Sequence, residues 1–225
     1  MKYKRLIKSH LVFSLLILTV GVIFLTSNCS EDKTLYRATS DYFPLKTGMI
    51  WHYLNSADTT DTCVVKVIGD TSAYGQPSIL VNRGSHEEYW IKDKTEIRKL
   101  VEIKINRAGY DFILEQQYRS YFQLPLIEGN SWRDDFTNTT DVFGESMIFR
   151  HIITGKVDTI EDIFTPAGDF YEVYQLTLID TIHCGDSLST TTSYYWLAPE
   201  VGVVKQRFEN EDTLEQIIVQ HITNQ

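Results

Sequence analysis

The sequence has few positive charges outside its first residues. Its 225 residues include 21 Lys and Arg against 30 Asp and Glu, and the four basic residues from Lys2 to Lys8 precede the first acid, Glu31. Without residues 1–28, the chain keeps 17 basic and 30 acidic residues, a net charge of −13 before histidines. So acidic a chain lacks the electrostatic footprint of a nucleic-acid binder and the basic patch that an anionic membrane surface attracts. We therefore expect no nucleic-acid partner.

The sequence also lacks the short motifs of familiar active sites. The histidines show no H-x-x-x-H or H-x-H spacing for zinc, and G-x-S-x-G, both glycine-rich phosphate loops and the EF-hand loop are missing. This pattern predicts no catalytic residue and no cofactor. The densest group of metal-ligand types is Asp180, His183 and Asp186. We interpret it as a polar hairpin tip, because a structural zinc site normally needs four ligands.

Acidic side chains are numerous enough for a hydrolase to be an alternative function. A pair of carboxylates can hydrolyse a glycosidic bond if their separation suits the reaction. The solubility of an exported protein explains the acids more simply. The dispersed carboxylates are Asp58, Asp61, Asp134, Asp135, Asp141, Glu145, Asp158, Glu161 and Asp162.

Residues 1–28 have the parts of an export signal. A basic stretch precedes the apolar run Leu11–Leu25, which is shorter than the roughly 20 residues of a membrane-spanning helix. The following Leu25-Thr26-Ser27-Asn28-Cys29 resembles the lipobox of bacterial lipoproteins, in which cleavage before the cysteine frees its thiol for diacylglycerol.

The lipobox resemblance implies a signal over 1–28, a lipid on Cys29 and a polar tether over 29–41. It places the protein in the bacterial cell envelope, held in the membrane by its N-terminal lipid, with Ser30 suiting the outer membrane on its periplasmic or surface face. Acylation would include palmitate. The alternatives are an uncleaved anchor and ordinary signal-peptidase cleavage nearby.

Cysteine is rare, with three in the chain. Assigning Cys29 to the lipid leaves Cys63 and Cys184. They could form a disulfide, which exported compartments permit, provided that their α-carbons lie within about 7 Å. Two separate buried thiols are the equal alternative.

Helix-favouring residues are also scarce. After residue 28, Thr, Ile and Val together number 52, whereas Ala and Leu number 19, a balance that favours strands. Alternation over 97–105 predicts one strand, and 201–207 with 214–222 predict a hairpin around 209–212. Further strands are expected at 49–55, 61–69, 78–83, 86–92, 110–118, 146–158, 170–180 and 190–197, with a helix as the alternative for 111–121. The sequence predicts an all-β or strongly β-dominated antiparallel fold, either a sandwich or an open half-barrel.

Two short patterns each occur twice and in the same order. They are Pro44-Leu45-x-x-Gly48-x-x-Trp51 with Pro125-Leu126-x-x-Gly129-x-x-Trp132, and Tyr89-Trp90-Ile91 with Tyr195-Trp196-Leu197. We interpret the proline as fixing an extended approach, the glycine as allowing a turn and the tryptophan as a core anchor. The patterns predict two related β-rich units, 42–120 and 121–225, packed as one body.

Three motifs together resemble a group of uncharacterised bacterial secreted proteins and lipoproteins built from β-strands. They are the P-L-x-x-G-x-x-W opening, Thr165-Pro166-Ala167-Gly168-Asp169-Phe170, and Tyr195-Trp196-Leu197-Ala198-Pro199-Glu200-Val201-Gly202-Val203-Val204-Lys205. The resemblance implies the fold and the exported location, and it supplies no catalytic residue. Gly168 fits a turn before a strand, and Gly202 permits a bend or bulge.

Two groups of side chains could serve a ligand. One is a set of tyrosines that could line a groove for a glycan, peptide or lipid chain, or simply fill a core. These are Tyr110, Tyr118, Tyr121, Tyr171, Tyr174, Tyr194 and Tyr195. The basic cluster Lys92, Lys94, Arg98, Lys99 and Lys104 is interpreted as a solvated hairpin that discourages edge pairing.

The sequence thus favours a non-enzymatic, lipid-anchored envelope protein that binds or scaffolds. Its partner would be an envelope protein, a glycan or a lipid. The alternatives are a carrier of a lipid or lipoprotein in a β-lined cavity and an envelope hydrolase that uses the dispersed carboxylates.

Overall fold

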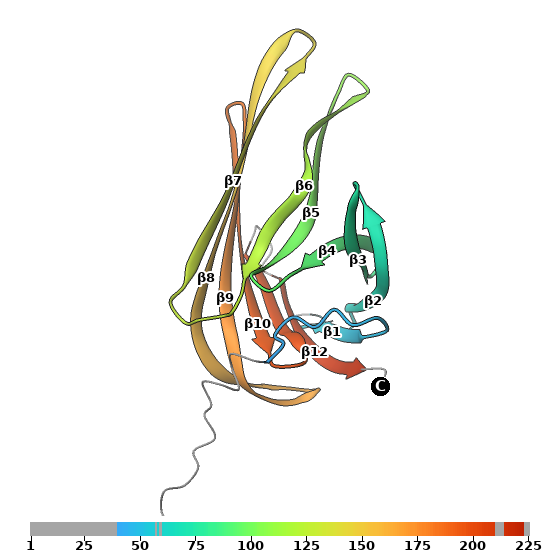
Figure 1. Cartoon of the computed structure of the whole chain (residues 1–225), viewed down its shortest axis with the longest axis vertical. Helices are drawn as coiled ribbons and strands as arrows, with labels where there is room; N and C mark the ends of the chain where they lie inside the picture. The colour runs from blue at the N-terminus through green and yellow to red at the C-terminus, as the bar shows by residue number, and fades with distance from the viewer. Residues whose placement is uncertain (1–39, 57, 59, 210–213, 223–225) are drawn as a thin grey trace, which may run out of the picture. The chain divides into compact units, whose positions relative to one another are not determined.

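The computed structural model describes residues 40–56, 58, 60–209 and 214–222. The export signal, Cys29 and nearly all of the tether lie outside the described residues. Within them, every regular element is a β-strand, and the paired strands are antiparallel (Figure 1). The prediction of an all-β antiparallel fold is confirmed.

Twelve strands form one continuous sheet, whose order is β6-β5-β4-β3-β2-β1-β12-β11-β10-β9-β8-β7. The first six strands are β1 (Ile50–Asn55), β2 (Thr62–Ala73), β3 (Gln76–Arg83), β4 (His86–Lys92), β5 (Glu96–Arg107) and β6 (Tyr110–Gln123). The last six are β7 (Ser131–Val142), β8 (Glu145–Thr165), β9 (Gly168–Cys184), β10 (Ser187–Ala198), β11 (Gly202–Glu209) and β12 (Leu214–Ile222).

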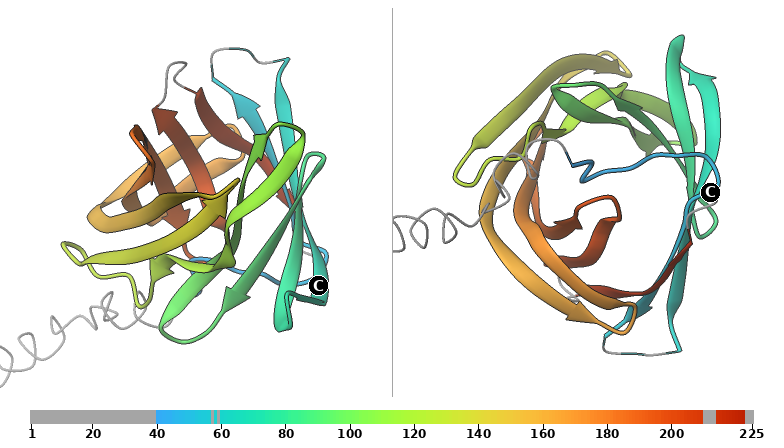
Figure 2. Two further views of the ribbon diagram at one scale, coloured as in Figure 1. Left: turned by 90° about the horizontal axis from the view of Figure 1, so that it is seen from above. Right: turned by 60° about the horizontal axis from the view of Figure 1, so that its bottom comes forward.

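The sheet consists of two meanders that the first and last strands join. β1–β6 follow one another from the middle of the sheet to one edge, β7–β12 follow one another from the other edge back to the middle, and β1 pairs with β12. Strand twist curls the sheet until it nearly closes on itself (Figure 2). Of the two predicted architectures, the half-barrel is therefore right, and the two-layer sandwich is wrong because there is only one sheet.

The helix considered for residues 111–121 is wrong, since this segment lies within β6. It pairs with β5 from Arg107↔Tyr110 to Glu96↔Gln123. The register shifts twice, and Leu114 and Tyr121 are the extra residues at the two bulges. A bulge places neighbouring residues on one face, so both Leu114 and Glu115 are buried. That local run of buried residues breaks the simple alternation of a strand.

The repeated P-L-x-x-G-x-x-W motif adopts the same local geometry at both of its positions. Gly48 and Gly129 each have a φ of 86°, which favours glycine. The amide of Gly48 donates to Val67 O and that of Gly129 to Val157 O, both at 2.9 Å. The motif precedes β1 in one case and β7 in the other. The division into units 42–120 and 121–225 itself stays a prediction.

The tryptophans of this motif lie in the core. Trp51 and Trp132 are each 5% exposed. Trp51 donates from Nε1 to Val201 O at 2.7 Å, which ties β1 to the Gly202 turn. Trp132 lies flat against Gly155 of β8, where a Cβ would overlap its indole ring.

The segment before β1 crosses one end of the curled sheet (Figure 2, right). Phe43 packs against Trp90 and Phe122, with ring centroids 5.1 and 5.4 Å apart. Lys92 Nζ donates to Phe43 O at 2.9 Å and pairs with Asp41. These contacts fix the segment across the interior of the sheet.

Candidate functional site

A cavity of about 410 Å³ lies on the inner face of the curled sheet. Its wall includes the crossing segment and strands β1–β6 and β9–β11. The aromatic side chains of the wall are Phe43, Trp51, Tyr53, Trp90, Tyr121, Phe122, Tyr195 and Phe208. Concave sites with a largely apolar lining and a few polar groups are the usual form of small-molecule sites, and this volume falls in their range of roughly 300–1,000 Å³.

Glu88 sits in the wall between two cations. Its Oε1 lies 2.7 Å from Lys99 Nζ and 3.4 Å from Arg83 Nε, and its Oε2 accepts from Trp90 Nε1 at 3.1 Å. Burial alone raises the pKa of Glu88, but Lys99 and Arg83 outweigh burial and hold the pKa below its usual value. Glu88 is therefore ionised at neutral pH.

The tyrosines of the wall are un-ionised donors. Burial raises the pKa of Tyr195 to about 12, although the Arg83 guanidinium acts in the opposite direction. Burial likewise raises the pKa of Tyr53 and Tyr121. Tyr53 donates its hydroxyl to Val203 O at 2.7 Å, which leaves its ring as an apolar surface of the cavity.

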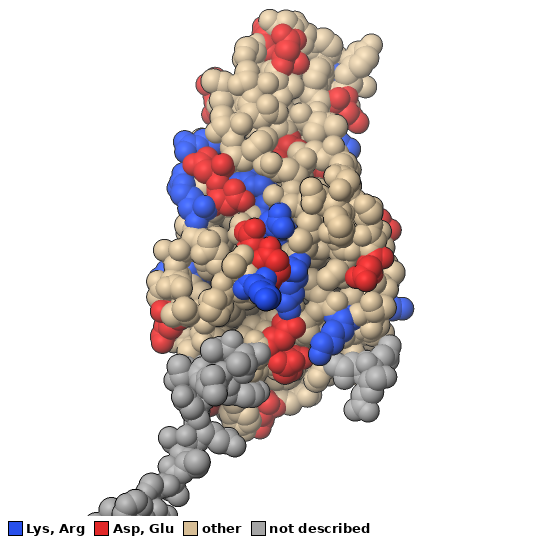
Figure 3. Space-filling model, in the orientation of Figure 1, with Lys and Arg blue, Asp and Glu red and all other residues tan. Residues whose placement is uncertain are grey.

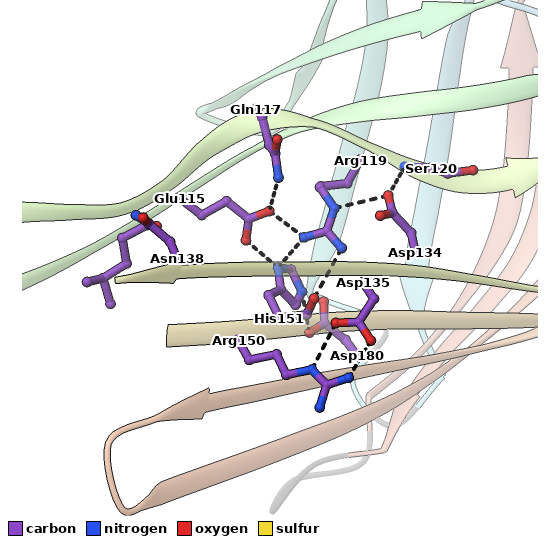
Figure 4. Close-up of polar contacts among 11 residues, drawn as sticks. Glu115, Gln117, Arg119, Ser120, Asp134, Asp135, Asn138, Arg150, His151 and Asp180 are labelled. Atoms are coloured by element: carbon purple, nitrogen blue, oxygen red, sulfur yellow. Dashed lines mark hydrogen bonds and ion pairs between the residues drawn. The ribbon is translucent and has the colours of Figure 1, made fainter. Parts of the chain in front are cut away.

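A second polar cluster, here called the seam network, lies where β6 approaches β7. It comprises Glu115, Arg119, Asp134, His151 and Asp180, from strands β6 to β9 (Figure 4). Arg119 Nε lies 3.0 Å from Asp134 Oδ2, and its Nη1 pairs with Glu115. His151 lies between two carboxylates, with Nδ1 2.5 Å from Glu115 Oε2 and Nε2 2.8 Å from Asp180 Oδ1.

Side chains of β7 also reach the backbone of β6. Asp134 accepts from the amide of Ser120 at 2.8 Å, and Asn138 Nδ2 donates to Leu114 O at 3.0 Å. β6 and β7 are the two end strands of the described sheet. Side chains of β7 thus provide partners for one amide and one carbonyl of the β6 edge.

The bulge at Leu114 puts Glu115 and Arg119 inside. Residues 115, 117 and 119 share a face after the bulge, and Gln117 donates to Glu115 at 3.2 Å. A one-residue shift exchanges the two faces of a strand. Glu115 and Arg119 are each 1% exposed.

His151 is positively charged at neutral pH. Burial by itself lowers the pKa of His151, but its hydrogen bonds to Asp180 and Glu115 outweigh burial and raise the pKa to about 9. For Glu115, burial acts to raise the pKa, whereas His151 and Arg119 bring it below its usual value. The seam network is therefore an ionic cluster, and both imidazole nitrogens have carboxylate partners.

Two carboxylates, Glu88 and Asp180, line the cavity, which raises the question of acid–base chemistry. Glycoside hydrolysis needs one carboxyl group with a raised pKa as the acid. The pKa of Glu88 is lowered, and Asp180 Oδ1 faces the protonated His151. Each carboxylate of the cavity therefore has a cationic partner.

Asp180, His183 and Asp186, the weak candidate for a metal site that we interpret as a polar hairpin tip, are not brought together. Asp180 lines the cavity, whereas His183, three residues further along β9, is exposed. Residues an odd number apart on a regular strand face opposite sides. Among the described residues, no three His, Cys, Asp or Glu side chains are grouped so as to hold a metal ion.

Cys63 and Cys184 are both free thiols. Cys63 lies on β2 and Cys184 at the end of β9, and four strands separate β2 from β9 in the sheet. Cys184 Sγ lies 3.6 Å from Met147 Sδ. Of the two alternatives, the structure has the separate thiols.

The other predicted groups divide between interior and surface. Tyr121 and Tyr195 line the cavity, Tyr174 packs against Tyr42, and Tyr110 and Tyr171 are exposed. The interpretation of the basic cluster as a solvated hairpin is wrong for its member Lys99, which turns into the cavity. The dispersed carboxylates include Asp134 of the seam network, whereas Asp135 pairs with Arg133 and Arg150, and Glu161 accepts from Trp196 Nε1.

The remaining motif residues lie in the core or at the first residue of a strand. Trp90 and Trp196 are each 5% exposed. Gly168, with a φ of 133°, begins β9 directly after the turn at 166–167. Gly202, with a φ of 92°, begins β11, and the β10–β11 ladder shifts register nearby, between Trp196 and Leu197. A Cβ on Gly202 would lie 3.3 Å from Pro44 Cδ, so the turn and the crossing segment lie in contact.

Basic and acidic side chains are intermingled over the middle of the face shown in Figure 3. No helix in the described ranges has the length and apolar character needed to cross a membrane.

No protein-family model matches this sequence, and no curated protein matches it. Two solved structures are similar to the chain. One is a proposed exported protein with a YmcC-like fold from Bacteroides fragilis, with 13% identity and a TM-score of 0.46, over 82% of this chain and 100% of that one. The other is a proposed lipoprotein from Parabacteroides distasonis, with 12% identity and a TM-score of 0.48, over 81% of this chain and 99% of that one. The identities are too low to transfer a function, which must be argued from the residues of this chain.

Proposed function

We propose that this chain is a lipid-anchored protein of the bacterial cell envelope that binds a small, largely apolar ligand inside its curled sheet and does no chemistry on it. The cavity of about 410 Å³ with its aromatic wall carries the proposal. Rigid aromatic walls with few polar groups bind through the area that they remove from water. The proposal joins the binding function that the sequence favours with the β-lined cavity of the carrier alternative.

The non-enzymatic part of the proposal rests on how the polar groups are engaged. Glu88 is bound by Lys99 and Arg83, and Asp180 by His151. General acid–base catalysis requires a group with a pKa near the working pH and access to substrate. His151 is 1% exposed and has a carboxylate at each nitrogen, so it serves as an ion-pair partner.

A pair of variants tests the cavity. Thr191 lines it, whereas the preceding Thr190 is exposed on the other face of β10. Thr191→Trp would place an indole ring in the cavity, and Thr190→Trp is the matched control because strands accept tryptophan. We expect the neutral dye N-phenyl-1-naphthylamine to fluoresce with the wild type and with Thr190→Trp, and at least tenfold more weakly with Thr191→Trp. Equal fluorescence from the two variants would contradict cavity binding.

A separate experiment tests the envelope location. The support is the sequence Leu25-Thr26-Ser27-Asn28-Cys29 after an apolar run. Cells that express the full chain would be labelled with radioactive palmitate. We expect Cys29→Ala to lose the label and Cys63→Ala to keep it, whereas equal labelling of Cys29→Ala and the wild type would refute the lipid anchor.

A further inference from the structure

Arg83 leaves one hydrogen-bonding group of the cavity wall unpartnered. Its Nε lies 3.4 Å from Glu88, but its Nη1 is buried and has no hydrogen-bond partner among the described residues. A buried, unpaired guanidinium nitrogen costs free energy that a ligand acceptor would recover. Arg83 also belongs to the lining of the cavity, which makes a ligand bound there the natural acceptor.

Arg83 belongs to a group of three charged side chains, with Glu88 and Lys99, whose net charge is +1. Arg83 and Lys99 both contact Glu88. The second carboxylate of the wall, Asp180, contacts His151, which it shares with Glu115 of the seam network. Glu88 can neutralise only one of the two cations that it contacts, and a monoanionic group beside Arg83 would neutralise the other.

We infer that the ligand is a single-chain amphiphile with a monoanionic headgroup, such as a fatty carboxylate, and that Arg83 binds this headgroup. The inference rests on the proposed function and names its ligand class. Arginine binds carboxylates through two parallel N–H donors, and the aromatic wall takes the apolar chain. A volume of about 410 Å³ lies near the lower end of the range for small-molecule sites, which suits one chain better than the several chains of a phospholipid.

Three ligands of equal chain length distinguish the contribution of the headgroup to affinity from that of the chain. Laurate, dodecanol and dodecyltrimethylammonium would be titrated into the wild-type protein by calorimetry at about pH 8, below their micelle concentrations. We expect laurate to bind at least tenfold more tightly than either of the others. Dodecanol that binds as tightly as laurate would overturn the headgroup assignment while leaving the cavity function intact. If none of the three binds, both proposals fail.

Variants then assign the headgroup contact to Arg83. Arg83→Met should weaken laurate binding by about 10- to 100-fold, the range for a hydrogen bond to a charged group, and change dodecanol binding by less than threefold. Arg83→Lys should fall between Met and the wild type, because it keeps the charge and loses the paired donors. Arg133→Met, which removes a 52% exposed guanidinium from β7, should bind laurate as the wild type does. An equal loss of laurate and dodecanol affinity in Arg83→Met would contradict a headgroup role for Arg83. The wild-type ligand series tests the ligand class even if a variant fails to fold.

Discussion

His151 Nε2 lies 2.8 Å from Asp180 Oδ1, and this contact connects the seam network to the wall of the cavity. The same histidine meets Glu115 of β6 through its other nitrogen. One side chain thus touches both the place where the sheet closes and the place where we propose that a ligand binds. We therefore expect substitutions in the seam network to change the stability of the fold and, through Asp180, the ligand site.

The guanidinium of Arg119 should be important for stability. Arg119→Met would remove one of the two cations that contact the buried Glu115, and breaking one partner of a buried ion pair typically costs about 3–5 kcal/mol. The measurement is the free energy of unfolding in urea. Arg133→Met is the control, because an exposed substitution should change that free energy by less than about 0.5 kcal/mol. A loss below about 1 kcal/mol for Arg119→Met would contradict the role given to the network.

The raised pKa of His151 predicts a stability that falls as pH rises. The pKa is about 9 in the folded protein against 6.5 as the ordinary value. The stabilisation from protonated His151 is therefore fully present below about pH 6.5 and is lost as pH rises through about 9. It amounts to roughly 3 kcal/mol, at 1.36 kcal/mol for each pKa unit.

Urea unfolding of the wild type and of His151→Gln between pH 6 and 10 would measure this dependence. We expect the two stability curves to converge as pH rises. NMR titration of the His151 imidazole gives the pKa directly. An imidazole that titrates near 6.5 would show that the carboxylates do not hold its proton.

The contact between Trp132 and Gly155 should tolerate no added methyl group. Gly155→Ala places a Cβ within the indole ring, and overpacking of this kind typically costs about 1–3 kcal/mol. The double variant Gly155→Ala with Trp132→Leu should recover part of that loss, because the smaller side chain makes room. Thermal unfolding measures both. Purely additive losses in the double variant would contradict a direct clash.

The two cysteines of the β-sheet should react as thiols. Protein purified from the envelope without reductant, then unfolded and alkylated, should gain one alkyl group at each of Cys63 and Cys184 by mass spectrometry. The positions of β2 and β9 in the sheet give the reason, since four strands lie between them. Failure of both sites to react before reduction, with reaction afterwards, would show a disulfide.

The residue pattern was sufficient to predict eleven of the twelve described strands, but it did not predict β7 (Ser131–Val142). It also contained a signal for the cavity, since Lys99 alternates with Ile97 and Val101 and therefore shares their inward face. A lysine on an apolar face needs an anionic partner, and Glu88 occupies the corresponding face of β4 beside Trp90. The sequence does not place the two strands side by side.

The seam network could not be predicted from sequence for a different reason. Its members come from four strands, and no local spacing links them. Glu115 faces inward only because of the bulge at Leu114, and a bulge depends on pairing with β5. Regular alternation alone would assign a residue that follows the bulge to the wrong face of the strand.

The pairing of β1 with β12 has a consequence for how the protein folds. Ile50 lies opposite Ile222, so this joint cannot form before residues 214–222 are available to pair. Hairpins within each meander can form early because their partners are near in sequence, whereas the final closure is a slow, long-range step. Until it occurs, β1 and β11 are open edges, and a chain truncated before β12 would expose both to association with other chains.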